Sequence, residues 1–297
     1  MDEILVLLAT YNGEKYLREQ LDSIFAQEGV AVSVLARDDG SSDDTKTILE
    51  EYRNKAKLNW YTGEHLNVQK GYMDLLQRAA QTDYEFFAFS DQDDVWDKDK
   101  LEIGIKTIKE KRIPALYYCG QRLVDGNLIY IEEHKMNPYR SDYARFMLND
   151  VAGCTEVFNR HLLDTVVTYT PSYMLMHDTW LLKVCLAVGG EICVDCDCHM
   201  SYRQHGNNVM GLKRDLKSKL LRVRHYINEQ KVEPQMRELS VGFQDRLVNN
   251  YKEIIEDTLN YKRSLKSRLR LLNRKKFNFA DGGVQSTYIL KILLNRL

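Results

Sequence analysis

The 297-residue chain carries 42 Lys or Arg residues and 43 Asp or Glu residues, so its formal net charge is only -1. This balance argues against nucleic acid as a partner. No apolar run approaches the roughly 18 residues of a membrane span, and the start of the chain, Met1-Asp2-Glu3, lacks the basic residues of a signal peptide. We therefore expect a cytoplasmic globular protein.

The first 120 residues predict strands that alternate with helices. Continuous apolar runs indicate buried strands, and apolar residues at helical spacing indicate the helices between them. Strands are expected at residues 4–9, 32–36, 58–61, 84–89 and 115–119. Helices are expected at residues 14–25, 43–55, 69–80 and 100–111. This alternation is typical of an α/β fold with a mostly parallel sheet and right-handed crossovers.

After Gly120 the alternation weakens, although residues 178–187 predict another helix. Beyond Gly211 the chain is helical, charged and basic in places. We therefore predict one α/β domain over residues 1–210 and a helical, basic extension over residues 211–297.

Two basic segments with interleaved leucines lie in the extension, at residues 213–224 and 262–276, and the second has eight Lys or Arg residues and no acid. One interpretation is a solvated helical face whose leucines pack on the core. The other is a peripheral contact with the inner face of an anionic membrane. Its apolar anchor would be Tyr288, Ile289, Leu290, Ile292, Leu293 and Leu294.

The six cysteines are expected to be free thiols in the cytoplasm. Three of them, Cys193, Cys196 and Cys198, precede His199 and suggest zinc. One ion could not take all four ligands without a tight knuckle, and no second cysteine pair follows at zinc-ribbon spacing. Cys196 and Cys198 would share one face of a strand, so we favour free thiols.

The stretch after the fourth predicted strand crowds three carboxylates, Asp91, Asp93 and Asp94, into four residues. Such like charges repel unless a cation lies between them, which indicates a bound divalent metal. Open α/β sheets bind ligands at the carboxyl ends of their strands, where this motif falls. The alternative is an acidic turn that caps the helix beginning near Lys98.

Two further polar loops end strands at the same edge, at residues 9–13 and 37–45. A uracil or thymine ring needs an acceptor for its N3–H, and the carboxylate of Asp39 provides one. Gly40 would let the backbone approach the base or ribose closely. The alternative is a tight turn with Asp43 as the helix cap. The chain lacks a glycine-rich dinucleotide or P-loop motif, so a metal and side chains would have to neutralise phosphates.

Together these motifs resemble the family 2 glycosyltransferases with the GT-A fold, whose mixed, mostly parallel sheet is flanked by helices. The resemblance is closest to the bacterial rhamnosyltransferase-like branch and covers about residues 3–210. Five stretches carry it in order: Ala9-Thr10-Tyr11-Asn12-Gly13, Asp38-Asp39-Gly40-Ser41-Ser42-Asp43, Asp91-Gln92-Asp93-Asp94, Met176-His177-Asp178 and Tyr202-Arg203-Gln204-His205-Gly206-Asn207-Asn208.

On the donor side, the resemblance implies that a loop of three residues lines the nucleoside pocket and that Asp39 binds the pyrimidine. The loop residues are Thr10, Tyr11 and Asn12. Asp91 would face the ribose or the metal, which is Mg²⁺ or Mn²⁺, and Asp93 would bind the metal directly.

Towards the acceptor, Asp178 matches the family's catalytic base, with helix capping at Thr179 as the alternative. His205 would contact the diphosphate or the metal, with Arg203 beside it. The chain departs from the family in having His177 where a glutamate commonly precedes the base.

The chemistry implied is inverting transfer of a sugar, with rhamnose as one candidate, from a UDP or dTDP donor to a saccharide or lipid-linked acceptor of cell-surface polysaccharide synthesis. A non-catalytic binding or scaffold protein of the same fold is the first alternative. A sugar nucleotidyltransferase is less favoured, because residues 9–13 have one glycine and no arginine where that class needs a glycine-rich loop with arginine.

Overall fold

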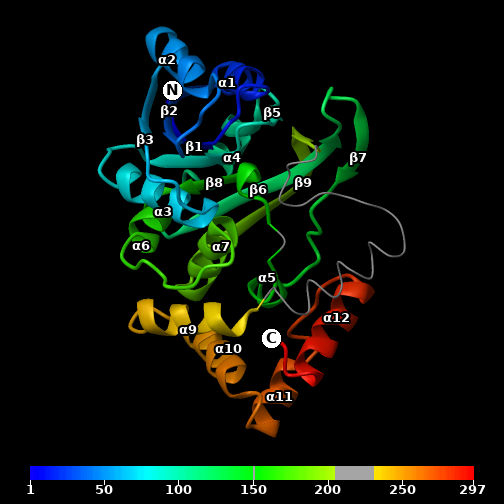
Figure 1. Cartoon of the computed structure of the whole chain (residues 1–297). Coiled ribbons are helices and arrows are strands. Elements are labelled where there is room, and N and C mark those ends of the chain that lie inside the picture. Colours follow the sequence, from blue (N-terminus) through cyan, green and yellow to red (C-terminus); the bar gives the residue numbers. More distant parts are fainter. Residues whose placement is uncertain (150, 205–230) are drawn as a thin grey trace.

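The computed structural model describes residues 1–149, 151–204 and 231–297. The strands in this part of the chain are β1 (Asp2–Thr10), β2 (Val30–Asp38), β3 (Leu58–Thr62), β4 (Phe86–Ser90), β5 (Val95–Trp96), β6 (Ala115–Val124), β7 (Tyr130–His134), β8 (Glu156–Asn159) and β9 (Glu191–Arg203). They form one sheet in the order β3-β2-β1-β4-β8-β6-β9-β5, and β7 pairs with β6 (Figure 1).

The first half of the sheet is parallel. β1 pairs with β2 on one side and β4 on the other, and β3 pairs with β2. The chain therefore reverses its direction of travel across the sheet at β1. Ligands of open α/β sheets bind outside the strand ends at such a switch point. The loops after β1, β2 and β4 meet there, as the sequence predicted.

The second half of the sheet is mixed. β8 runs antiparallel to β4 and β6, and β5 runs antiparallel to β9, whereas β9 is parallel to β6. The prediction of a mixed, mostly parallel sheet is confirmed, but its elements did not include β8 or a full-length β9. β9 contains the cysteine cluster, and all six cysteines are free thiols.

Helices cover both faces of the sheet. Along β1, Ile4, Val6 and Leu8 join a cluster with α1 (Leu17–Phe25), α2 (Thr45–Lys55) and α4 (Lys100–Ile108). Leu5 and Leu7 point to the other face and join α3 (Val68–Ala79), α6 (Arg160–Val166) and α7 (His177–Ala187). The alternation of β1 side chains thus builds two cores and a three-layer molecule.

The C-terminal helices lie beneath α7 (Figure 1). They are α9 (Glu233–Gly242), α10 (Asn249–Asn260), α11 (Leu265–Leu271) and α12 (Gly282–Leu293), and a short helix, α5 (Asp142–Phe146), lies near them. Their apolar side chains belong to the same core cluster as α7, where Trp180 lies 6.1 Å from Phe243 between ring centroids.

The predicted boundary at residue 210 and the basic segment 213–224 lie outside the described residues, so the two-domain division stays a prediction. Within the described ranges, every helix falls short of the length and apolarity that crossing a bilayer requires.

Candidate functional site

The loops after β1 and β2 hold each other. The Asn12 amide donates to Ser41 Oγ at 2.9 Å, and Asn12 Oδ1 accepts from the Ser42 amide at 2.9 Å. The side chain of Asp38 accepts from the amides of Gly40 and Ser41, and Gly40 adopts φ +88°. The tight-turn interpretation therefore holds for Asp38, but the N-cap of α2 is Asp44 and not Asp43. The Asn12 side chain supports the loop, and Thr10 is buried below it.

The backbone of Asp39 and the rings of His65 and Tyr11 come together at these loops. The Asp39 amide donates to the Thr10 carbonyl at 2.9 Å, and its own carbonyl lies 3.0 Å from His65 Nδ1. The His65 ring lies 4.9 Å from the Tyr11 ring, which is 48% exposed. Exposed aromatic faces suit the stacking of a nucleobase. The sequence did not single out His65, because this residue comes close to Tyr11 only when β1 and β3 lie in the same sheet.

The acidic loop after β4 is tied to the β1 loop by Gln92. Its Oε1 accepts from the Tyr11 amide at 2.9 Å, and its Nε2 donates to the Tyr11 carbonyl at 3.1 Å. A Cβ at Gly13 would lie 2.3 Å from Gln92 Oε1, so glycine is required for this approach. The two predicted donor-binding loops therefore form one unit.

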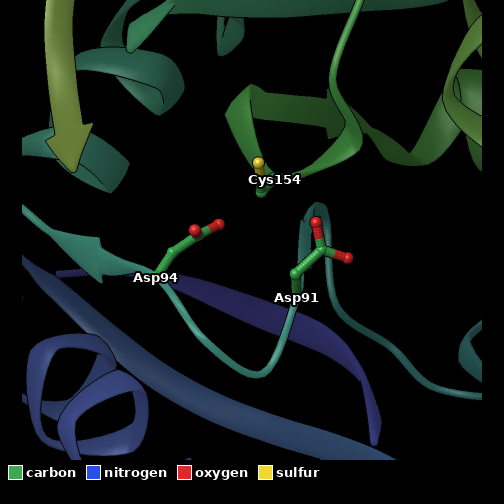
Figure 2. Close-up of side chains that lie close together, drawn as sticks. All are labelled: Asp91, Asp94 and Cys154. Atoms are coloured by element: carbon green, nitrogen blue, oxygen red, sulfur yellow. The ribbon is translucent and has the colours of Figure 1, made fainter. Parts of the chain in front are cut away.

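Asp91 and Asp94 lie on either side of the same turn (Figure 2). Their carboxylates and the thiol of Cys154, from the short 3-10 helix η1 (Gly153–Thr155), offer atoms within 4.8 Å of one another. Burial raises the pKa of Asp91 to about 7, and the charge of Asp93 adds to this rise. The hydroxyl of Tyr72 donates to Asp91 Oδ1 at 3.1 Å and opposes it.

Asp94 faces the interior of the protein. Its side chain is fully buried, and Oδ1 accepts from the Arg203 amide at 3.1 Å. Burial raises the pKa of Asp94 well above its usual range, and the charges of Asp93 and Asp91 add to the rise. Burial lowers the pKa of the fully buried Lys100, and the charge of Asp94 is among those that oppose this lowering. These contacts give Asp94 a structural role.

Asp91 and Asp93 are partly exposed, unlike Asp94. Their repulsion, which contributes to the raised pKa of Asp91, is what a divalent cation would relieve. Carboxylate oxygens are the ligands that Mg²⁺ and Mn²⁺ prefer. The residues present therefore fit such an ion.

Asp178 lies in the first turn of α7, which begins at His177 and has Met176 at its N-cap. The interpretation of Asp178 as the cap is therefore wrong. Its carboxylate accepts from the Gly153 amide at 3.0 Å and from the Thr179 amide at 2.5 Å. Burial raises its pKa to about 6, and these amides oppose the rise. The charge of Asp178 also helps to raise the pKa of Asp91, although burial and the charge of Asp93 contribute more.

His177 packs instead of contacting Asp178 by a hydrogen bond. Its ring stacks on Tyr72 at 3.7 Å between centroids and meets Phe89 edge-on at 4.8 Å. Neither ring nitrogen has a hydrogen-bond partner among the described residues. Burial lowers the pKa of His177 to about 3, so the ring is neutral. It supports Tyr72, which in turn orients Asp91.

Arg203 ends β9 with its guanidinium buried under the acidic loop. Nε donates to the Asp93 carbonyl at 2.7 Å, Nη1 donates to the Gly126 carbonyl at 2.8 Å, and Nη2 pairs with Glu19. The side chain is 1% exposed and positions the loop. Its predicted contact with the donor stays a prediction. His205 lies outside the described residues.

A GT-A-like fold with polar loops and an acidic motif at one edge of its sheet defines the class of this protein. A model of the family described as glycosyl transferase family 2 matches residues 5–167, more than half of the chain. The chain belongs to this family, as the motifs predicted.

Two relatives illustrate the similarity. The dTDP-rhamnosyl transferase RfbG of Shigella flexneri is 28% identical over 237 residues, which cover 73% of this chain and 78% of RfbG. The UDP-Glc:alpha-D-GlcNAc-diphosphoundecaprenol beta-1,3-glucosyltransferase WfgD of Escherichia coli is 28% identical over 167 residues, 55% of this chain and 64% of WfgD.

Two solved structures share the fold. S. aureus TarS 1-349 in complex with UDP-GlcNAc has a TM-score of 0.61 at 21% identity, over 98% of this chain and 79% of that chain. The mannosyltransferase PcManGT from Pyrobaculum calidifontis, in complex with GDP-Man and Mn2+, has a TM-score of 0.58 at 14% identity, over 99% of this chain and 86% of that chain. At these identities the likeness shows the fold alone.

Proposed function

We propose that this chain is an inverting, metal-dependent glycosyltransferase of cell-surface polysaccharide synthesis. It uses a UDP or dTDP sugar and transfers the sugar to a saccharide or lipid-linked acceptor. The observation that carries the proposal is that Asp39 and the pair Asp91 and Asp93 lie in loops at one edge of the sheet, and that the charge of the buried Asp178, in the first turn of α7, reaches Asp91. RfbG favours dTDP-rhamnose as the donor, and WfgD favours a lipid-linked diphosphate as the acceptor.

On the donor side, the base stacks on the exposed ring of Tyr11, which His65 supports from beside it, and Asp39 accepts its N–H. Asp91 and Asp93 hold the divalent cation. When bound, this ion supplies the positive charge that stabilises the departing nucleoside diphosphate. The tie from Gln92 to Tyr11 keeps the base-binding loop and the acidic loop in one register.

On the acceptor side, Asp178 takes the proton of the attacking hydroxyl. A carboxylate with a pKa of about 6 is ionised at neutral pH and is a better proton acceptor than an ordinary aspartate. The amides of Gly153 and Thr179 orient it. The hydroxyl oxygen attacks the anomeric carbon as the bond to the diphosphate breaks, so the configuration inverts in one displacement.

Neither alternative is favoured. Membership of glycosyl transferase family 2 argues against a sugar nucleotidyltransferase. A non-catalytic binding protein would have no need of Asp178, and hydrolysis of a nucleotide sugar with added Mn²⁺ would separate it from an enzyme.

A panel of nucleotide sugars tests the donor. We expect UDP and dTDP sugars to raise the melting temperature of the full chain in the presence of Mn²⁺, since ligands that bind only the folded state stabilise it. Stabilisation by GDP or CMP sugars alone would contradict the proposal.

The metal is tested with Asp93→Ala. This variant should lose transfer activity and the enhancement of donor binding by Mn²⁺, measured by titration with and without the ion. Asp99→Ala is the matched control. Asp99 belongs to a second group with Asp97 and His199, in which Asp97 already pairs with Arg122. Metal-enhanced binding in Asp93→Ala would exclude this residue from the site.

We also propose a peripheral contact of α11 and α12 with the inner face of the membrane. Leu265 and Leu269 of α11 are 72% and 60% exposed, and Leu290 and Leu293 of α12 and Leu294 just after it are exposed as well. The anchor expected from sequence needs correction, because Tyr288 and Ile292 are buried in the core. The Arg268 side chain donates to Asn295 Oδ1 at 2.6 Å and thereby joins α11 to the end of α12.

A further inference from the structure

Arg37, the residue that precedes the Asp38-Asp39 pair, has a buried side chain that is 1% exposed. Its Nη1 forms an ion pair with Asp39 Oδ1. Its Nε donates to Asp74 Oδ2 at 3.0 Å, and its Nη2 donates to the Glu64 carbonyl at 2.7 Å. All three guanidinium nitrogens are therefore committed to the protein.

The surroundings are built around this guanidinium. The hydroxyl of Tyr61 donates to Asp74 Oδ2 at 2.6 Å, the same oxygen that Arg37 contacts. A Cβ at Gly63 would lie 2.4 Å from Nη2 of Arg37, and a Cβ at Gly71 would lie 3.2 Å from Nη1. Two glycines thus leave the space that Arg37 fills, and Asp74 holds the side of the guanidinium away from Asp39.

One oxygen of Asp39 remains for a ligand. Arg37 occupies Oδ1, whereas Oδ2 lies 3.9 Å from the position that a Cβ of Gly71 would take. The Asp39 side chain is 14% exposed, so part of it reaches the surface of the protein. A carboxylate with one free oxygen can accept one N–H in its plane.

We propose that Arg37 is a specificity-determining residue that restricts Asp39 to bases that offer a ring N–H without an adjacent amino group, uracil and thymine. This inference rests on the proposed function, in which Asp39 binds the base. Uracil and thymine offer N3–H between two carbonyl acceptors. Guanine offers N1–H and an adjacent amino group, which pair best with both oxygens of a carboxylate. Cytosine has no hydrogen at N3, so its ring nitrogen and Oδ2 would be two acceptors facing each other.

The test compares UDP and GDP as ligands, with Mn²⁺ present, by calorimetry on the full chain. The wild-type protein should prefer UDP by about tenfold or more, the effect of one charge-assisted hydrogen bond. In Arg37→Met, Asp39 Oδ1 is released, and this preference should fall to about threefold or less. The ratio of the two affinities is the readout, because a general loss of stability weakens both ligands alike.

Arg160→Met is the matched control. Arg160, the first residue of α6, is also a largely buried arginine that donates to backbone carbonyls, those of Thr82 and Tyr84. These carbonyls precede β4, away from the loops that follow the strands. This variant should keep the wild-type ratio. If Arg37→Met does not fold, Arg37→Gln serves instead, because its shorter, neutral side chain cannot form the ion pair with Asp39 Oδ1. An unchanged ratio in the Arg37 variant, or equal binding of UDP and GDP to the wild-type protein, overturns the inference.

A second ligand separates this inference from the proposed function. N3-methyl-UDP lacks the ring N–H and should bind the wild-type protein at least about tenfold more weakly than UDP. If it binds equally well, Asp39 does not bind the base at N3, and the donor side of the proposed function fails together with the role of Arg37. If it binds weakly but Arg37→Met keeps the wild-type ratio, only the role of Arg37 fails.

Discussion

Asp178 has structural contacts in addition to its proposed chemical role, and they decide how it should be substituted. Asparagine keeps the volume and one oxygen that can accept from the Thr179 amide, but it cannot take a proton. We expect Asp178→Asn to lower the transfer rate by about 10²- to 10⁴-fold, the usual loss for a general base, while donor affinity stays near wild type. Initial rates and donor titrations measure the two effects.

Asp142→Asn is the control for this substitution. Asp142 also lies in the first turn of a helix, α5, so the change in charge at a helix start is the same. This variant should retain wild-type transfer. Transfer by Asp178→Asn within a few-fold of wild type would reject Asp178 as the base.

His177 predicts how stability depends on pH. Burial holds its pKa at about 3 in the folded protein, whereas an unfolded histidine titrates near about 6.5. Below that pH His177 takes up a proton in the unfolded state but stays neutral in the folded state, so stability falls as the pH falls. Between pH 7 and pH 5 the loss is about 2 kcal/mol, and His177→Phe, which keeps a ring against Tyr72, should remove it.

Urea unfolding of the wild-type protein and of His177→Phe, each at pH 7 and at pH 5, measures this loss of stability. Asp91 and Asp178 have raised pKa values and therefore act in the opposite direction, gaining stability as the pH falls. Both proteins contain these carboxylates, so the difference between the two proteins isolates His177. If the free energies of unfolding of the two proteins differed by the same amount at both pH values, His177 would be protonated in the folded state as easily as in the unfolded state.

At the scale of elements, α4 packs on β8 through Gly104. A Cβ at this position would lie 2.7 Å from Val157 Cγ2 and 3.2 Å from Tyr117 Cδ1. Alanine gains up to about 1 kcal/mol of helix propensity over glycine, but overpacking costs about 1–3 kcal/mol. We expect Gly104→Ala to lower the free energy of unfolding by about 1–2 kcal/mol, measured by urea denaturation.

Gly282→Ala provides the comparison. A Cβ there would meet nothing within 4 Å, so this variant should be as stable as the wild-type protein or slightly more stable. If Gly104→Ala were equally stable, the close approach of α4 to β8 would be wrong.

The elements that sequence predicts well are those with one simple periodicity. The strands β1 to β4 are mostly apolar, and α1 to α4 have one apolar face, so both were found within a few residues. β8 has four residues, and β9 alternates cysteine with aspartate, so neither produced an apolar run. Their position depends on pairing with β6, which is a long-range property.

The candidate site follows the same division. The loops with Asp39, Asp91 and Asp93 were predictable, because the ends of parallel strands share an edge of the sheet. The partners of these residues were not. Arg37, His65 and Tyr72 reach the site from different elements, and only the folded chain brings them there.

At the scale of the whole molecule, the exposed leucines of α11 predict binding to anionic vesicles. Lys266 and Arg270 lie beside Leu265 and Leu269 on the exposed side of the helix. Burial of one leucine in lipid contributes about 1.5–3 kcal/mol, so Leu269→Glu should weaken binding by about tenfold or more. Cosedimentation of the full chain with vesicles that contain an anionic lipid measures this.

Val241→Glu is the matched variant, since Val241 is 67% exposed but lies on α9. It should bind like the wild-type protein, and neutral vesicles should bind neither. Wild-type protein that ignores anionic vesicles would contradict the contact, and equal weakening by Val241→Glu would place the contact elsewhere.

One element, α7, joins the edge of the sheet that carries the candidate site to the layer of C-terminal helices. Asp178 lies in its first turn, and at its other end the carbonyl of Ala187 accepts from the amide of Val248, just before α10. Its eleven residues span about 16 Å. If the layer of C-terminal helices rests on lipid, α7 sets the distance between the lipid headgroups and the reacting hydroxyl. Acceptors would then be sorted by the height at which they present that hydroxyl above the bilayer, as well as by the identity of their sugar.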